Sequence, residues 1–128
     1  MRSRLRERRA GISAGEAAGA VAAAATWLTN SPEFAHAERI AGYAAVRGEL
    51  DPLIVLEAAL DSGKAVYLPR IAEDFRLHFA RWRPGDPLCE NRYGIPEPQA
   101  ARELADPDTF DLVIVPLLGF DGTGARLG

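Results

Sequence analysis

The feature that most constrains the fold is the final stretch of the sequence, residues 111–128, which reads DLVIVPLLGFDGTGARLG. Asp111 precedes four apolar residues, 112–115, and such a run is typical of a strand that is buried on both faces in the middle of a sheet. Pro116 ends this strand because proline lacks the N–H that a sheet requires. The glycine-bearing turn 121–124 is of a kind that presents backbone N–H groups to phosphate, although similar turns often only connect two elements.

Size and composition predict one cytoplasmic domain. The chain has 128 residues, of which 48% are hydrophobic, which suits one core of ordinary size and is too little for two domains. No stretch reaches the roughly 18 to 20 apolar residues of a membrane span, and no short apolar core of a secretory signal follows the basic start. The single cysteine, Cys89, excludes an internal disulfide and a thiolate metal cluster. His36 and His78 are isolated, so no metal site is predicted.

The first nine residues are strongly basic, with five arginines and one glutamate, whereas the formal net charge of the whole chain is −3. Arg2, Arg6 and Arg9 would share one side of a helix, and Arg4 and Arg8 would form a second row. Three interpretations remain open: a solvated terminal helix or tail, a helix that contacts a polyphosphate, and an arm that binds RNA. The acidic remainder of the chain makes RNA binding the weakest of the three.

The pattern of the remaining chain predicts alternating helices and strands. Ser13 and Glu16 form a capping box, which predicts a helix over 14–29. We expect a strand over 39–46, a helix that starts at Asp51-Pro52 and ends near 62–63, a strand over 64–70 and a strand with one wet face over 76–82. Prolines keep 91–98 extended, and 100–105 is expected to form a short helix. Lys64 is interpreted as structural, because a cation beside a helix C-terminus complements the helix dipole.

Strand, helix and strand in succession form a βαβ crossover, which requires parallel strands. We therefore expect an α/β fold, a three-layer sandwich with a mostly parallel, Rossmann-like sheet. In such sheets ligands bind outside the carboxyl ends of the strands, which is where Glu49 follows the first predicted strand. By composition alone Glu49 is equally a solvent-exposed loop acid.

The stretch 111–128, preceded by RYGIPEP and LPRI, resembles 5-formyltetrahydrofolate cyclo-ligases, also called methenyltetrahydrofolate synthetases. The resemblance spans nearly all 128 residues in family order. It implies a fold related to sugar-phosphate isomerases and CoA transferases. In the family the chain continues past the position of Gly128 into a glycine-rich segment that ends in Tyr-Tyr-Asp, wraps the ATP phosphates and brings a magnesium ligand. Residues 1–128 are thus expected to be the N-terminal part of a single cyclo-ligase domain, incomplete at its C-terminus.

The function implied by the resemblance is the cyclisation of 5-formyltetrahydrofolate to 5,10-methenyltetrahydrofolate, with ATP converted to ADP and phosphate. ATP and Mg²⁺ are the implied cofactors, and the complete protein is expected to be a monomer that binds no nucleic acid and no membrane. The competing interpretation is a non-catalytic α/β effector-binding or interaction module. The residues that match the family pattern fall into two groups: Ala44, Glu49 and Tyr93 for the folate, and Arg2, Arg6, Arg126, Leu127 and Gly128 for ATP.

Two further expectations concern the end of this sequence. If 111–115 is apolar on both faces and no helix covers it, part of its surface should be exposed. The loop 121–128 should lack the contacts that order it. These 128 residues alone are then expected to be poorly stable or self-associating, and inactive as an enzyme.

Overall fold

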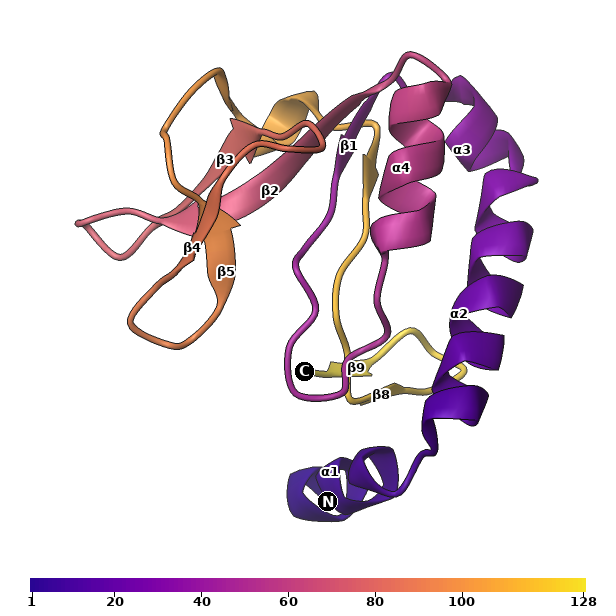
Figure 1. The fold of residues 1–128 in the computed structure, drawn as a ribbon. Coiled ribbons are helices and arrows are strands. Elements are labelled where there is room, and N and C mark those ends of the chain that lie inside the picture. The colour runs from indigo at the N-terminus through magenta and orange to yellow at the C-terminus, as the bar shows by residue number, and fades with distance from the viewer.

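The computed structural model describes residues 1–128 and is built around a five-stranded mixed sheet with the strand order β6-β3-β2-β1-β7 (Figure 1). β1 pairs in parallel with β2 and with β7, whereas β3 runs antiparallel to both β2 and β6. The α/β class is confirmed, but the prediction of a mostly parallel sheet is wrong. The strands are β1 (Arg39–Ala41), β2 (Ala65–Ile71), β3 (Leu77–Arg81), β6 (Leu104–Ala105) and β7 (Leu112–Val113).

The capping box predicts the start of α2 (Ala14–Thr29) correctly, whereas the crossover helix begins at Leu53, one residue later than predicted, with Pro52 as its N-cap. The Ser13 hydroxyl accepts the backbone N–H of Glu16 at 3.1 Å and donates to the Glu16 carboxylate at 3.1 Å, which confirms the helix over 14–29. Asp51 Oδ1 likewise accepts the N–H of Leu53 at 3.0 Å at the start of the crossover helix. None of the helices is both long and apolar enough to cross a membrane. The helices are α1 (Arg2–Ala10), α2 (Ala14–Thr29), α3 (Pro32–His36) and α4 (Leu53–Asp61).

One hydrophobic core joins α2, α3 and α4 to a single face of the sheet (Figure 1). Ile40, Val66 and Leu68 face this core and are almost fully buried. Tyr67 points to the opposite face, because side chains alternate along a strand, and its ring packs against Phe110 at 5.2 Å between centroids. This chain therefore contains two layers of the predicted three-layer sandwich, with no helix over the second face of the sheet.

The strand predicted to lie in the middle of the sheet instead lies at its edge. β7 contains only Leu112 and Val113, and its one neighbour is β1. Val113 is 48% exposed and Val115 is 43% exposed, so the expected exposure of apolar surface is confirmed. The apolar run 112–115 predicts burial correctly for one face of β7 only. No helix covers the other face, and no strand pairs with the other edge.

Two short hairpins extend the structure beyond the main sheet. β4 (Leu88–Glu90) pairs with β5 (Pro96–Pro98), and β8 (Gly119–Phe120) pairs with β9 (Arg126–Leu127), both antiparallel. The prediction that 91–98 is extended is confirmed at β5, which contains both prolines. Proline is tolerated there because a two-stranded ribbon leaves edge positions free.

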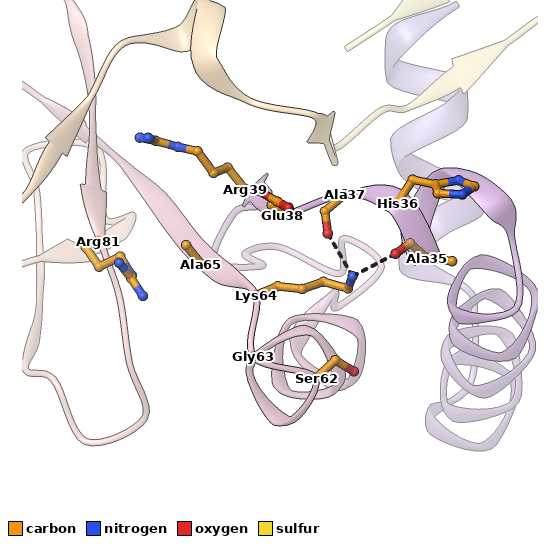
Figure 2. Close-up of a pocket in the computed structure, with 10 residues that line it drawn as sticks. All are labelled: Ala35, His36, Ala37, Glu38, Arg39, Ser62, Gly63, Lys64, Ala65 and Arg81. Carbon is orange, nitrogen blue, oxygen red and sulfur yellow. Dashed lines mark hydrogen bonds between the residues drawn. The ribbon is translucent and has the colours of Figure 1, made fainter.

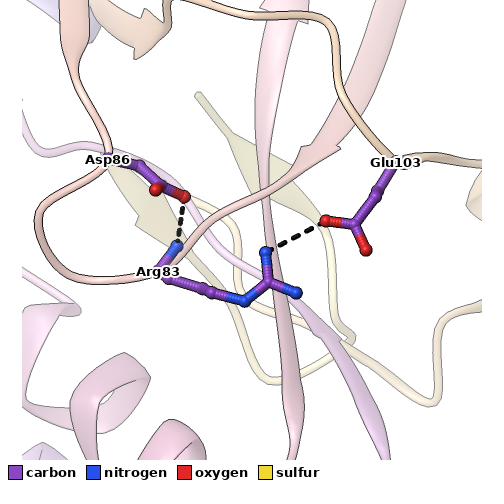
Figure 3. Close-up of polar contacts among 3 residues, drawn as sticks. All are labelled: Arg83, Asp86 and Glu103. Atoms are coloured by element: carbon purple, nitrogen blue, oxygen red, sulfur yellow. Dashed lines mark hydrogen bonds and ion pairs between the residues drawn. The ribbon is translucent and has the colours of Figure 1, made fainter.

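The helix predicted over 100–105 is wrong. Leu104 and Ala105 pair with β3, and Glu103 has a positive φ of 45° that no helix accepts. Arg83 Nη1 donates to Glu103 Oε2 at 3.0 Å, and Asp86 Oδ2 accepts the Arg83 N–H at 2.9 Å (Figure 3). Tertiary pairing thus overrides the helix propensity of this alanine-containing stretch. A 3₁₀ turn, η1 (Pro107–Thr109), then leads into β7.

Lys64 is structural as predicted, but its ammonium group contacts the end of α3 and not the end of α4, the helix that precedes it in sequence. Its Nζ donates to the carbonyl oxygens of Ala37 at 2.7 Å and Ala35 at 3.2 Å, and it lies 5.1 Å from the centroid of the Phe34 ring. These carbonyls belong to the C-terminal end of α3, where a cation is favourable. Lys64 therefore joins the start of β2 to α3.

Asp111 connects the start of β7 to the start of β1 by hydrogen bonds, and we expect their contribution to stability to depend on pH. Its Oδ2 accepts the N–H groups of Glu38 at 2.8 Å and Arg39 at 3.0 Å, and these two hydrogen bonds lower the pKa of Asp111 below its ordinary value of 3.8. Because the pKa of Asp111 is lower in the folded chain than in the unfolded chain, the ionised carboxylate stabilises the fold at pH values above the unfolded pKa. This contribution is lost as the pH falls through the folded pKa.

The expected result is a lower melting temperature for Asp111→Asn at neutral pH, with a difference from the unchanged chain that shrinks once the pH falls below about 4. Thermal unfolding followed by circular dichroism between pH 3 and pH 7 measures both proteins. A difference that stays constant across this range would show that the charge of Asp111 does not contribute.

Candidate functional site

Strand β1 is shorter than predicted, and the loop that follows it turns sharply. The predicted strand 39–46 ends at Ala41, and the next residue, Gly42, passes so close to α4 that a Cβ atom there would lie 2.7 Å from Leu56 Cδ2. Arg47 and Gly48 both have positive φ, 51° and 76°, and form the tip of the turn. Such a conformation favours glycine, and it places Arg47 and Glu49 at the carboxyl end of β1.

A cavity of about 430 Å³ at this turn gathers side chains from three distant parts of the sequence. It contains Arg6 from α1, Glu49 from the turn, and Gly128, three of the eight predicted site residues. Arg9 and Arg47 also contribute to the cavity, although neither was predicted as a site residue. Arg9 shares one predicted side of the helix with Arg2 and Arg6, and this spacing is a signal that could have identified it. The cavity therefore combines three cationic groups with one carboxylate.

Glu49 is half-buried, and its carboxylate makes no ion pair within 4.0 Å. The nearby Tyr43 hydroxyl donates a short hydrogen bond to the Leu50 carbonyl. Burial, together with the charges of Glu49 and Asp51, raises the pKa of Tyr43 to about 12, so this hydroxyl remains a donor at neutral pH. The carboxylate of Glu49 is consequently available to accept hydrogen bonds from a ligand.

Arg126 and Leu127 line a second cavity, of about 400 Å³, between α1 and the β8–β9 hairpin. Leu5 of α1 packs on this hairpin so closely that a Cβ atom on Gly119 would lie 3.2 Å from Leu5 Cδ1. Figure 1 shows α1 and this hairpin at the same end of the molecule as the loop after β1. Arg2 is exposed on α1 and lines neither of these two cavities.

The turn 121–124 uses its own N–H groups internally. Asp121 Oδ1 accepts the N–H of Thr123 at 2.8 Å, the hydroxyl of Thr123 at 2.6 Å and the N–H of Ala125 at 3.1 Å. The hydrogen bonds from Thr123 and Ala125 lower the pKa of Asp121. The expectation of a loop without ordering contacts is therefore wrong for this turn. Because Asp121 accepts the N–H groups of Thr123, Gly124 and Ala125, these groups are not free to bind phosphate, which leaves the residues after Ala125 as the candidates for that role.

Ala44 lies in an apolar pocket of about 190 Å³ between the loop after β1, α4 and the β4–β5 hairpin. Eight of its ten lining residues are hydrophobic, among them Trp82, which is 8% exposed and belongs to the hydrophobic core. The mostly apolar walls suit an apolar part of a ligand.

Tyr93 is half-exposed and is linked to the site through its main chain. Arg47 Nη2 donates to the Tyr93 carbonyl oxygen at 2.9 Å, which ties the turn that carries Glu49 to the segment 91–98. Asn91 Oδ1 accepts the N–H of Tyr93 at 2.8 Å, so the segment is also ordered locally. The aromatic ring of Tyr93 does not line the pocket that contains Ala44.

Glu97 anchors this segment to the main sheet, a role that the sequence did not indicate. It is only 8% exposed, and its Oε2 accepts the N–H of Ile71 at 3.0 Å and the side-chain amide of Asn91 at 3.2 Å. Arg70 Nε donates to the Pro98 carbonyl at 2.7 Å on the other side. These contacts hold the extended segment 91–98 against the main sheet.

Comparison with known proteins identifies the family. The model of the 5-formyltetrahydrofolate cyclo-ligase family matches residues 1–128. The 5-formyltetrahydrofolate cyclo-ligase of Escherichia coli K12 is 35% identical over 109 residues, which cover 82% of this chain and 59% of the relative. The enzyme of the same name from Haemophilus influenzae is 30% identical over 132 residues, which cover all of this chain and 70% of the relative.

Solved structures agree in fold. The NMR structure of Aquifex aeolicus 5,10-methenyltetrahydrofolate synthetase superimposes with a TM-score of 0.87 at 27% identity, over 99% of this chain and 64% of that chain. The structure of the Mycoplasma pneumoniae 5,10-methenyltetrahydrofolate synthetase has a TM-score of 0.68 at 18% identity, and this likeness concerns the fold alone. This chain spans about 59% of the length of the E. coli relative. It belongs to the 5-formyltetrahydrofolate cyclo-ligase family.

Proposed function

We propose that the chain carries the folate site and part of the ATP site of an ATP-dependent cyclo-ligase that converts 5-formyltetrahydrofolate to 5,10-methenyltetrahydrofolate in the cytoplasm. Glu49, Ala44 and Tyr93 hold the folate. The residues that hold ATP are Arg2, Arg6, Arg126, Leu127 and Gly128. The complete protein acts as a monomer in folate and one-carbon metabolism.

The observation that carries the proposal is the 430 Å³ cavity in which Arg6, Glu49 and Gly128 meet. These residues come from the start, the first half and the end of the sequence, yet each was assigned to the folate or to ATP from its match to the family pattern. An enzyme that joins a folate to a phosphoryl donor needs both binding groups in one space. The arrangement supports the proposed assignment of these three residues.

The chemistry requires positioning and charge neutralisation. ATP transfers its γ-phosphoryl group to the formyl oxygen of the substrate, N10 attacks the activated formyl carbon, and phosphate leaves as the ring closes. Arginine side chains favour this transfer because they neutralise charge on the phosphoryl oxygens and bind them bidentately. Glu49 accepts hydrogen bonds from N–H groups of the pterin and so fixes its orientation.

The resemblance places the magnesium ligand in the part of the family that follows the position of Gly128, and residues 1–128 contain no group of three or more His, Cys, Asp or Glu side chains that could hold a metal ion by themselves. No step above is therefore assigned to magnesium.

The proposal is tested by isothermal titration calorimetry of a version of the chain lengthened to the size of its relatives, with 5-formyltetrahydrofolate and, separately, with ATP. We expect saturable binding of each ligand at one site. A non-catalytic interaction module would bind neither ligand, and that result would overturn the proposal.

The basic helix α1 provides a matched pair of variants for the ATP titration. Arg6 lines the cavity with Glu49 and Gly128, whereas Arg4 belongs to the other row of the helix. Arg6→Gln should weaken ATP binding by roughly 1.5 to 3 kcal/mol, the range for a hydrogen bond to a charged group, and Arg4→Gln should leave it nearly unchanged. Equal losses in the two variants would indicate general attraction to the arginine-rich helix rather than a site.

A further inference from the structure

A second polar cavity lies at the other end of the sheet from α1, where β1 and β2 begin. It has a volume of about 670 Å³ and is bounded by the end of α3, the turn before β2, and Arg81 at the end of β3 (Figure 2). None of the residues assigned above to the folate or to ATP lines it. Its role is therefore separate from the proposed reaction.

Two arginines of this cavity are held in place by the same aromatic ring. The guanidinium carbon of Arg39 lies 5.1 Å from the centroid of the Tyr67 ring, and that of Arg81 lies 5.9 Å from it. Stacking on a tyrosine orients a guanidinium group without neutralising its charge. Figure 2 shows both groups on the opposite side of Ala65 from the Lys64 ammonium group.

Neither guanidinium group makes an ion pair within 4.0 Å, although the charge of Arg39 helps to lower the pKa of Asp111 and that of Arg81 helps to lower the pKa of Glu103. The Nε atoms of Arg39 and Arg81 are buried and have no hydrogen-bond partner. The ion pairs of the structure involve two other arginines, Arg76 with Asp74 and Arg83 with Glu103. A guanidinium group that is partly removed from water without a partner is unfavourable, and an oxyanion with matching geometry relieves this cost.

The other charged groups nearby do not supply that partner. The Lys64 ammonium group is satisfied by the carbonyls of α3, and the Asp111 carboxylate accepts the backbone N–H groups of Glu38 and Arg39. The exposed His36 and Glu38 side chains also line the cavity, and Glu38 makes no ion pair within 4.0 Å. The cavity itself is lined by three cationic side chains, those of Arg39, Lys64 and Arg81, and by one carboxylate, that of Glu38, and the two arginines on Tyr67 make no direct ion pair.

We propose that Arg39 and Arg81 form a binding site for a small oxyanion, the phosphate or carboxylate group of a ligand. Their outer N–H groups bind the anion from two neighbouring sides, and the Tyr67 ring keeps both guanidinium groups in position. The anion lies on the same face of the sheet as the Tyr67 ring, and no helix of this chain covers that face.

Inorganic phosphate is the probe for this site. Arginine Nε–H signals are resolved in ¹H–¹⁵N spectra, so a phosphate titration of the labelled chain reports on Arg39 and Arg81 directly, with sodium chloride at equal ionic strength as the reference. We expect saturable shifts of these two signals. Arg39→Gln and Arg81→Gln should each weaken phosphate binding by about threefold to tenfold, as expected for one partly exposed charged contact.

Arg83→Gln is the matched control, because Arg83 follows β3 closely in sequence but is already paired with Glu103 (Figure 3). It should leave the phosphate affinity unchanged. Shifts that grow linearly without saturation, or an equal loss in the Arg83 variant, would overturn the proposal. Because Arg39 and Arg81 lie on different strands, one variant remains informative if the other fails to fold.

The oxyanion has two possible sources, a dissolved ligand and a carboxylate of the additional polypeptide that the longer relatives possess. The same titration on a version lengthened by that part separates them. A response to phosphate identifies a dissolved ligand, whereas signals that are already shifted and do not respond identify a carboxylate of the chain. Signals that are neither shifted nor responsive would contradict an oxyanion site.

Discussion

Replacement of Ile40 with alanine is expected to lower the free energy of unfolding by roughly 2 to 5 kcal/mol, which would unfold much of a marginally stable chain. Ile40 has no exposed surface and lies in β1, where the sheet meets the core formed with α2, α3 and α4. Truncation removes buried apolar surface and leaves a cavity that the surrounding strands cannot fill. Urea denaturation followed by circular dichroism measures the loss.

Ile54 provides the matched control, because it is the same residue type but is 50% exposed on α4. Ile54→Ala should change the stability by less than about 1 kcal/mol. Similar losses for the two variants would contradict the placement of β1 at the centre of the core.

Glu49→Gln is expected to weaken the binding of 5-formyltetrahydrofolate by roughly 1.5 to 3 kcal/mol, about ten- to a hundredfold, because the charge that strengthens hydrogen bonds from the pterin is lost. The glutamine keeps the size of the side chain, so the shape of the site is preserved. ATP binding should be spared, because the arginines of the cavity remain. Calorimetric titration with each ligand measures both effects.

The control for this variant is Glu57→Gln on the exposed side of α4, outside the cavity around Glu49. It should bind folate as the unchanged chain does. Unchanged folate affinity in the Glu49 variant would remove Glu49 from the site.

Elements that are specified by neighbouring residues could be predicted from the sequence. The capping box at Ser13 determines where α2 begins, because a capping side chain bonds to N–H groups within three residues of itself, and Asp51, one residue before the N-cap of α4, accepts the N–H of Leu53. The parallel pairing of β1 with β2 follows from the helix between them.

Elements that depend on distant partners could not be predicted in the same way. An apolar run indicates that a strand can be buried, but it does not indicate how many strands pair with it. The run 112–115 therefore predicts a central strand, whereas β7 lies at the edge of the sheet. The antiparallel direction of β3 follows from the tight turn 72–76, in which the Ala72 N–H donates to the Arg76 carbonyl at 2.9 Å, and this turn carries no glycine or proline to indicate it. The stretch 100–105 forms part of the sheet because of its pairing with β3.

The site was predictable only through the resemblance to the family. No local pattern joins Arg6, Glu49 and Gly128, and their meeting in one cavity is a consequence of the fold. The role of Arg47 could not be read from the sequence, because its contact with Tyr93 spans 46 positions.

The measurement that tests the central claim most directly is an absorbance assay for 5,10-methenyltetrahydrofolate, with 5-formyltetrahydrofolate, ATP and Mg²⁺ supplied. It compares the 128-residue chain with a version lengthened to the size of the relatives, of which the chain spans 59% and 70% in the two cases above. We expect the lengthened version to form the product and the 128-residue chain to form none, because the residues assigned to ATP make up only part of its site. Activity in the 128-residue chain would contradict this placement of the ATP site, and inactivity of the folded, lengthened version would contradict the proposed reaction.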